Sequence, residues 1–109
     1  MTTPFYLKTG DTSPALSVTL KDADGNAVDL TGATVVFNMN NEDDEQVIDR
    51  GACTILVAAS GTVKYSWSAA DTATAGYYTA EFEVTYSDTT VETFPNRGYL
   101  EVQITDDLE

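Results

Sequence analysis

Three aspartates, Asp22, Asp24 and Asp29, are the residues of this chain best suited to bind a metal ion. Carboxylate oxygens are ligands that Ca²⁺ prefers, and the turns of a β-sandwich sometimes supply them. The stretch does not match an EF-hand loop, because Gly25 comes too early and no glutamate closes the loop. A tight turn at Gly25 and Asn26 explains the same residues, since Gly and Asn tolerate positive φ angles. The three aspartates are kept as calcium candidates, but the turn is favoured and no cofactor is expected.

The sequence offers little that a catalytic site requires. It contains no histidine, which removes the commonest general base and excludes a Ser-His-Asp triad. The single cysteine, Cys53, alternates with Ile55 and Val57, a pattern typical of a buried small side chain rather than a reactive thiol. No glycine-rich phosphate-binding loop is present, and carboxylate pairs in so acidic a chain do not single out a glycosidase. We therefore predict that the protein is not an enzyme.

The charge balance argues against two classes of partner. Eighteen acidic residues and five basic ones give the 109-residue chain a formal net charge of −13. Such a surface repels phosphate backbones and anionic membranes, so we expect neither nucleic acid nor membrane as a partner. No apolar run approaches the ~20 residues of a membrane-spanning helix, and the first residues lack the pattern of a signal peptide. One cysteine allows no internal disulfide, and synthesis in the cytoplasm is expected.

Four glutamates suggest a surface that docks another protein: Glu81, Glu83, Glu92 and Glu101. The first two lie on the polar side of the longest alternating segment, and the others lie in the segments that follow it. If these segments share a sheet, like charges face each other across neighbouring strands and repel. A basic surface on another protein relieves that repulsion, whereas the alternative is simple solvation with screening over about 8 Å. The acidic run at 42–45 is expected to be a solvated loop, with docking of a basic partner as its alternative.

Apolar and polar residues alternate along most of the chain, which indicates half-buried β-strands. No window shows a convincing helical period of 3.6 residues. Turn-forming residues separate the alternating runs. Strands are expected at about 5–8, 16–20, 33–39, 53–57, 63–67, 77–86, 91–94 and 100–104.

These strands predict an all-β fold, an immunoglobulin-like β-sandwich of about 7–9 antiparallel strands in a single domain spanning residues 1–109. The segment before the longest strand resembles the corner at which an immunoglobulin tyrosine hydroxyl bonds to nearby backbone. Tyr78 is the better candidate for that role, because it shares the apolar side with Ala80 and Phe82. Trp67 is expected to be the core indole. The immunoglobulin cysteine pair is absent, so only the architecture is predicted.

A set of short motifs runs through nearly the whole chain. They are Gly10–Pro14, Leu16–Leu20, Asp22–Gly25, Val28–Phe37, Gly61–Trp67, Asp71, Gly76–Tyr78, Glu81–Val84 and Glu92–Pro95. Together they resemble the N-terminal domain of phage baseplate upper proteins, and Asp-Leu-Thr-Gly-Ala-Thr-Val at 29–35 is the more specific part. The resemblance implies an immunoglobulin-like domain of a tailed-phage virion or prophage-derived tail, which anchors a longer protein to the baseplate. It implies no catalytic residues.

We therefore predict a non-enzymatic structural protein of a tailed bacteriophage virion, in the tail or baseplate, neck or head. It is expected to dock in many copies on other virion proteins. Because no receptor-binding or coiled-coil part follows Ile104, a small separate component is expected. The segment up to Thr9 and the tail after Ile104 are expected to add strands to neighbours. The alternative is a carbohydrate- or surface-binding module that stacks sugars on Tyr6, Tyr77 and Tyr99, although nothing in the sequence predicts that these tyrosines converge.

Overall fold

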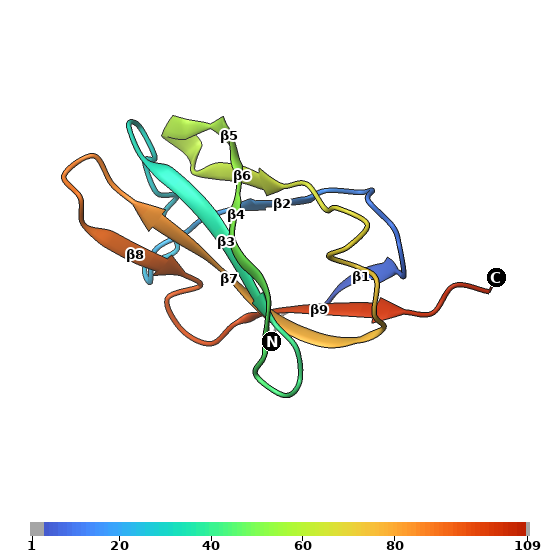
Figure 1. Cartoon of the computed structure of the whole chain (residues 1–109). Helices are drawn as coiled ribbons and strands as arrows, with labels where there is room; N and C mark the ends of the chain where they lie inside the picture. The colour runs from blue at the N-terminus through green and yellow to red at the C-terminus, as the bar shows by residue number, and fades with distance from the viewer. Residues whose placement is uncertain (1–3, 109) are drawn as a thin grey trace.

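Two β-sheets pack face to face in the computed structural model, which describes residues 4–108 (Figure 1). In chain order the strands are β1 (Phe5–Lys8), β2 (Leu16–Thr19), β3 (Thr34–Asn40), β4 (Gln46–Ala52), β5 (Thr54–Val57), β6 (Thr62–Tyr65), β7 (Gly76–Thr85), β8 (Val91–Phe94) and β9 (Leu100–Thr105). A short 3-10 turn, η1 (Ala58–Ser60), joins β5 to β6. No helix in this part of the chain has the length and apolar character needed to cross a membrane.

The larger sheet has six strands, in the order β1-β9-β7-β3-β4 with β8 also paired to β7. The long strand β7 organises this sheet, because β3 runs along one edge while β9 and β8 share the other. The smaller sheet has the order β2-β6-β5 and lies above the larger one in Figure 1. The predicted all-β sandwich is confirmed, and its strand pairs are antiparallel except for β1 and β9, which run parallel.

The core between the sheets is built from the apolar side of each alternating strand, because successive side chains of a strand point to opposite faces. In β7 the buried residues are Tyr78, Ala80, Phe82 and Val84. Phe37 of β3 lies at the centre and reaches across to the smaller sheet, where its ring centroid is 4.6 Å from that of Tyr65. Trp67 is 4% exposed and packs edge-on against Phe37, which confirms the prediction of a core indole.

The strand β4 is the one strand that the alternation did not predict. Only one of its residues, Ile48, is buried. Its pairing with β3 shifts in register, and Arg50 adopts a left-handed backbone with a φ of 54°. Such irregularities remove the period of two from the sequence, so β4 is defined by its pairing with β3 rather than by its own pattern.

The predicted tyrosine corner is present before β7. The Tyr78 hydroxyl donates a hydrogen bond to the backbone carbonyl of Thr74, with 2.5 Å between the oxygens. The same segment is tied to the start of the chain by Thr72, a fully buried residue whose hydroxyl donates to the carbonyl of Asp11 at 2.9 Å. A second bond runs from the backbone N–H of Gly10 to the carbonyl of Thr72 at 3.0 Å. These contacts fix the end of the sandwich next to the start of β7.

The N-terminal segment forms a strand within its own sheet. Residues Phe5–Lys8 form β1, which pairs with β9 on one side and is the last strand of the larger sheet on the other. The backbone N–H of Thr9 continues the pairing by donating to the carbonyl of Thr105 at 2.9 Å. The expectation that this segment adds a strand to a neighbour therefore stays a prediction, and it concerns the edge of β1 that faces away from β9.

Candidate docking surface

The outer side of the six-stranded sheet collects the polar residues of neighbouring strands. Side chains paired across strands project to the same side, so the register defines this surface. We call it the outer face, and its residues are Tyr6, Lys8, Val36, Asn38, Asn40, Tyr77, Thr79, Glu81, Glu83, Glu101 and Gln103, with Tyr99 beside them. Glu81 lies opposite Asn38, and Glu101 lies opposite Thr79. Within residues 4–108 neither glutamate side chain has an ion pair or hydrogen bond.

Glu83 differs from these two glutamates because the chain supplies its cation. An Arg50 guanidinium nitrogen lies 2.7 Å from a carboxylate oxygen of Glu83. Arg50 is held in place by its backbone N–H, which donates to the side-chain oxygen of Asn38 at 2.8 Å. This pair was not predicted from the sequence because β4, the strand that carries Arg50, has no alternating pattern.

Glu92 shares the sheet with the other glutamates but not its outer side. The register of β7 and β8 pairs Glu92 with Val84, a core residue, so the side chain projects toward the inner side at the edge of the sheet. There its carboxylate accepts a hydrogen bond from the Tyr86 hydroxyl at 2.7 Å and another from the Asn96 amide at 3.2 Å. The grouping of Glu92 with the outer glutamates is therefore corrected, because the β7–β8 register decides its side.

Three exposed tyrosines surround the unpartnered glutamates. Tyr6, Tyr77 and Tyr99 are 59%, 55% and 61% exposed. Tyr6 and Tyr77 flank the same residue, Gln103, from the two strands on either side of it. Tyr99 precedes β9 and lines a hollow together with Glu81. The tertiary structure thus brings onto one surface three tyrosines whose convergence no sequence pattern predicted.

Two shallow hollows on the outer face each combine a carboxylate with a tyrosine ring, and Thr79 lines both. The first has a volume of about 130 Å³ and is lined by Glu81 and Tyr99. The second has a volume of about 150 Å³ and is lined by Glu101 and Tyr77, with Glu42 beside them. A carboxylate beside an aromatic ring suits the side chain of arginine or lysine, through an ion pair and a cation–π contact.

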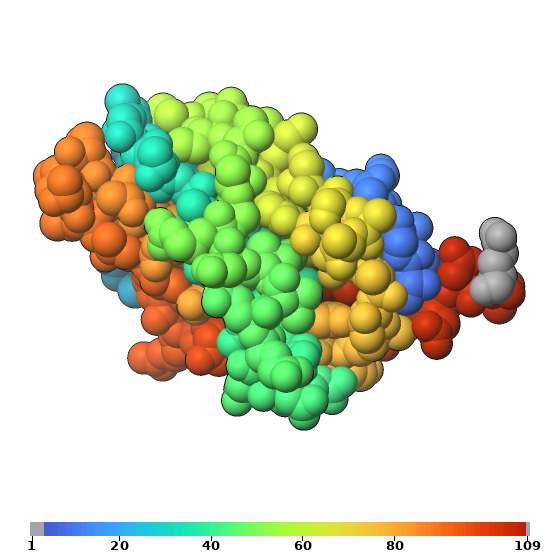
Figure 2. All heavy atoms as spheres, in the orientation of Figure 1, coloured from blue at the N-terminus to red at the C-terminus, as the bar shows by residue number. Residues whose placement is uncertain are grey.

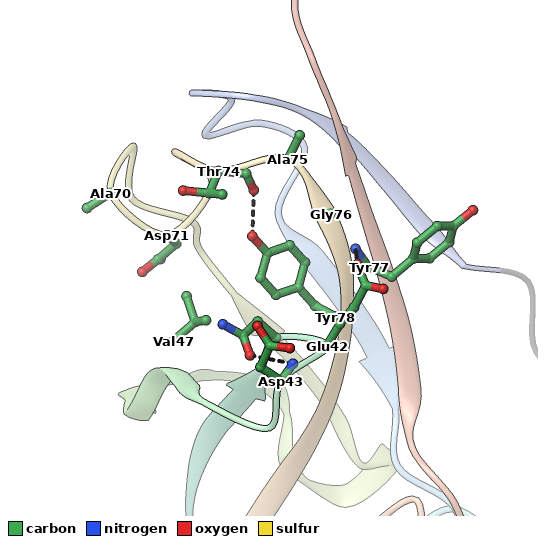
Figure 3. Close-up of a pocket in the computed structure, with 11 residues that line it drawn as sticks. Glu42, Asp43, Val47, Ala70, Asp71, Thr74, Ala75, Gly76, Tyr77 and Tyr78 are labelled. Carbon is green, nitrogen blue, oxygen red and sulfur yellow. Dashed lines mark hydrogen bonds between the residues drawn. The ribbon is translucent and has the colours of Figure 1, made fainter.

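The tip of the β3–β4 hairpin, which carries the acidic run 42–45, borders the outer face. A pocket of about 280 Å³ lies between this tip and the segment before β7, the green and yellow regions of Figure 2. Figure 3 shows Glu42 and Asp43 on one side of this pocket, while the ring of Tyr77 points away from that of Tyr78. A Glu42 carboxylate oxygen accepts a hydrogen bond from the backbone N–H of Tyr77 at 3.3 Å. The acidic tip is therefore tied to β7 at the border of the outer face.

Two of the three calcium candidates, Asp22 and Asp29, accept hydrogen bonds within turns, and Asp24 donates its backbone N–H to Asp22. One carboxylate oxygen of Asp22 accepts the backbone N–H groups of Asp24 and Asn26 at 2.9 and 3.0 Å. Asp29 accepts the hydroxyl and backbone N–H of Thr31, and these bonds hold the pKa of Asp29 below its usual value. No group of three potential metal ligands occurs within residues 4–108. We therefore propose no calcium site.

The cysteine has the properties of a packing residue. Cys53 is half-buried against the core, and this burial raises the pKa of its thiol to about 12. A thiol with so high a pKa stays protonated at neutral pH and is a poor nucleophile.

Comparisons with known proteins agree with this two-sheet architecture. Among solved structures, CopC from Methylosinus trichosporium OB3b is similar, with a TM-score of 0.55, 10% sequence identity and coverage of 99% of this chain and 89% of that chain. At this identity the similarity shows the fold alone. No curated protein matches the chain. Residues 1–95 match the model of the BppU N-terminal domain. The chain therefore belongs to the family of BppU N-terminal domains, the N-terminal domains of phage baseplate upper proteins.

Proposed function

We propose that this domain is a non-enzymatic structural component of a phage baseplate, which docks in multiple copies through its outer face onto a basic surface of a neighbouring virion protein. The family supports the baseplate role. The observation that carries the docking surface is the pair Glu81 and Glu101, two carboxylates without a cation among the described residues, each beside an exposed tyrosine.

Arginine is the side chain that best matches this surface. Its planar guanidinium stacks on a tyrosine ring and binds a carboxylate through two parallel hydrogen bonds. Tyrosine and arginine are also the residues that most often dominate the binding energy of protein interfaces. The net charge of −13 supports the same partner, because it repels other acidic copies and speeds encounter with a basic surface.

The test is incorporation of charge-reversed variants into virions. Virions are produced with Glu81→Lys and Glu101→Lys together, and the copies per particle are counted by quantitative mass spectrometry. The matched control is Asp24→Lys with Asp106→Lys, which changes the net charge equally at two exposed positions outside the outer face. We expect the first pair to be depleted from particles at least about tenfold, since like charges then oppose the basic partner, and the control to be retained.

Equal incorporation of both pairs would contradict the docking surface. Cryo-electron microscopy of the wild-type virion tests the location separately. A two-sheet domain in the baseplate density, with its outer face against another protein, is the expected result.

The three tyrosines on one face also support a second candidate function, binding of a surface carbohydrate. Aromatic rings on a flat sheet are stacking platforms for sugars. Glycan titration followed by tyrosine fluorescence, with Tyr77→Ala as the control, distinguishes this function from protein docking. Saturable binding that the variant loses would favour the carbohydrate, and an unchanged signal would leave protein docking as the explanation of the face.

A further inference from the structure

The strand β2 has one unpaired edge. It pairs with β6 on one side, and no strand within residues 4–108 pairs with its other side. The β2–β6 register continues to Leu20, whose N–H donates to the carbonyl of Gly61 at 2.8 Å. Bonded and non-bonded pairs alternate in an antiparallel ladder, so the backbone N–H and C=O groups of Ser17 and Thr19 point away from β6. These groups form a free edge that a further strand can pair with.

Two apolar hollows lie in line along this edge, between the two sheets. The first has a volume of about 270 Å³ and is lined by Leu16 and Val18 of β2 and by residues of β1 and β9. The second has a volume of about 190 Å³ and is lined by Val18 and Leu20, facing Phe94. Both are lined by Val18 and Leu100, and their β2 residues are offset by two positions, which is about 7 Å along a strand. This spacing matches side chains i and i+2 of an added strand.

In the pattern of immunoglobulin constant-type domains, the sheet that contains strands B, E and D carries a fourth strand, A, beside B. By strand order β2, β6 and β5 occupy the positions of B, E and D. The first strand of this chain, β1, pairs instead with β9 in the other sheet. The free edge of β2 is therefore the position at which a sandwich of this kind accommodates one more strand.

Two lysines lie beside this edge, and one carboxylate, that of Glu101 in β9, lines the first hollow. Lys64 is the single charged residue in β2, β5 and β6, and the register places it opposite Ser17. Lys21 follows β2 and lines the second hollow. Neither lysine forms an ion pair within the described chain. The register with Thr79 places the Glu101 side chain on the outer side of the larger sheet, whereas Lys64 shares the smaller sheet with an added strand and therefore favours an acidic residue in it.

A second copy of this domain does not supply a suitable segment from its described residues. Its segments with an acidic residue between two apolar ones include 82–84 and 100–102, which are strands of its own sheet. A third, 28–30, ends in Leu30, which is fully buried in the core.

We propose that the free edge of β2 receives an extended segment of another baseplate protein, with apolar side chains at i and i+2 that fill the two hollows and an acidic residue between them that faces Lys64. Binding by strand addition takes its affinity from main-chain hydrogen bonds and its specificity from the alternate side chains. This site lies at the edge of the smaller sheet, and it shares with the outer face one residue, Glu101, which lines the first hollow.

The test uses the whole protein and the synthetic peptide acetyl-Thr-Thr-Val-Glu-Val-Thr-Thr-amide. Binding is followed by NMR amide shifts and by hydrogen exchange at Ser17 and Thr19. Three control peptides each differ from it in one respect. The first has its valines adjacent (Val-Val-Glu), and the second has lysine in place of glutamate. The third carries backbone N-methyl groups that block one edge of the peptide. We expect protection of both amides by the first peptide, and binding about tenfold weaker for the N-methylated peptide, which loses two backbone hydrogen bonds.

The protein side of the contact is tested by Ser17→Pro, with Ser17→Ala as the control. Proline is tolerated on an edge strand where the N–H faces solvent, so the fold is expected to persist while binding is lost. The alanine variant keeps the N–H and is expected to bind as the wild type does. The proposal would be overturned if the adjacent-valine peptide bound as well as the first peptide. It would also be overturned if the amides of Ser17 and Thr19 stayed unprotected at a saturating concentration of the first peptide. These peptide experiments test the proposal even if the proline variant does not fold.

Discussion

The two sheets of this domain present different chemistry to solvent. The outer face of the six-stranded sheet carries glutamates and exposed tyrosines, whereas the strands of the three-stranded sheet contain no acidic residue. The smaller sheet instead exposes Leu56 and Val57, which are 46% and 50% accessible, and the unpaired edge of β2 above two apolar hollows. A net charge of −13 is therefore distributed unevenly, and a single number for the chain conceals a neutral-to-basic sheet. The difference indicates two kinds of contact, one through charged and aromatic side chains and one through backbone pairing.

The inner sides of the two sheets, in contrast, form one shared core. The substitution with the largest expected loss of stability tests this. Phe37→Ala removes a fully buried ring that contacts Tyr65 and Trp67. We expect a loss of about 3–5 kcal/mol in the free energy of unfolding, measured by urea denaturation. Val36→Ala, on the other side of the same strand, is the control and should cost less than about 1 kcal/mol. Two separate unfolding transitions would show instead that the sheets are independent.

Each sheet also contributes one buried tyrosine whose hydroxyl anchors the segment before β7. Tyr65, from the smaller sheet, donates to the carboxylate of Asp71 at 2.6 Å, while Tyr78, from the larger sheet, donates to a backbone carbonyl. A bond to a charged acceptor contributes about 1.5–3 kcal/mol and a neutral one about 1 kcal/mol. Tyr65→Phe is therefore expected to destabilise more than Tyr78→Phe, with exposed Tyr77→Phe as a silent control. The reverse order in urea denaturation would contradict this ranking.

Alkaline pH is expected to lower the stability of the fold through two tyrosines, the buried Tyr65 and the half-buried Tyr86. Burial, with a smaller contribution from the hydrogen bond to Glu92, raises the pKa of Tyr86 to about 12 from its ordinary value of 10.0. Burial, followed by the bond to Asp71, also raises the pKa of Tyr65. The folded state holds these protons more tightly, so their stabilisation is complete below pH about 10 and is lost as pH rises toward about 12.

This dependence is measured as urea midpoints across that pH range, with tyrosinate absorbance as the direct readout. Tyr86→Phe should reduce the slope of stability against pH. An unchanged slope in the variant would show that Tyr86 titrates alike in the folded and unfolded states.

The smallest expected effect on stability concerns the ion pair between Arg50 and Glu83 on the outer face. Arg50 is 59% exposed at its side chain, so solvent screens its attraction to Glu83. A double-mutant cycle of Arg50→Gln and Glu83→Gln should give a coupling energy below about 1 kcal/mol that declines with added salt. A coupling above about 2 kcal/mol would mean that this face is organised for stability rather than for contact with a partner.

Individual residues show which parts of the fold and of the docking surface could be predicted from the sequence. Tyr78 and Trp67 were predictable as core residues because alternation indicates which side chains are buried. The hydrogen bond of the Tyr78 hydroxyl was predictable because a buried hydroxyl needs an acceptor, whereas the Trp67 indole N–H has no partner among the described residues. The side of the sheet on which Glu92 lies was not predictable. The order of strands in the sequence does not determine which residues of two neighbouring strands pair with each other. β4 and Arg50 were missed because bulged strands carry no period-two signal.

The amino-acid pattern by itself determined the all-β class, eight of the nine strands, most of the turns and the overall acidity, because these are local or additive properties of the chain. Pairing and register were decided only by the tertiary structure. They place Tyr6 and Tyr77 on either side of Gln103, pair Arg50 with Glu83, and leave β2 with a free edge above two apolar hollows. These contacts join residues far apart in the chain, and their selection depends on how all the strands pack together rather than on any one segment.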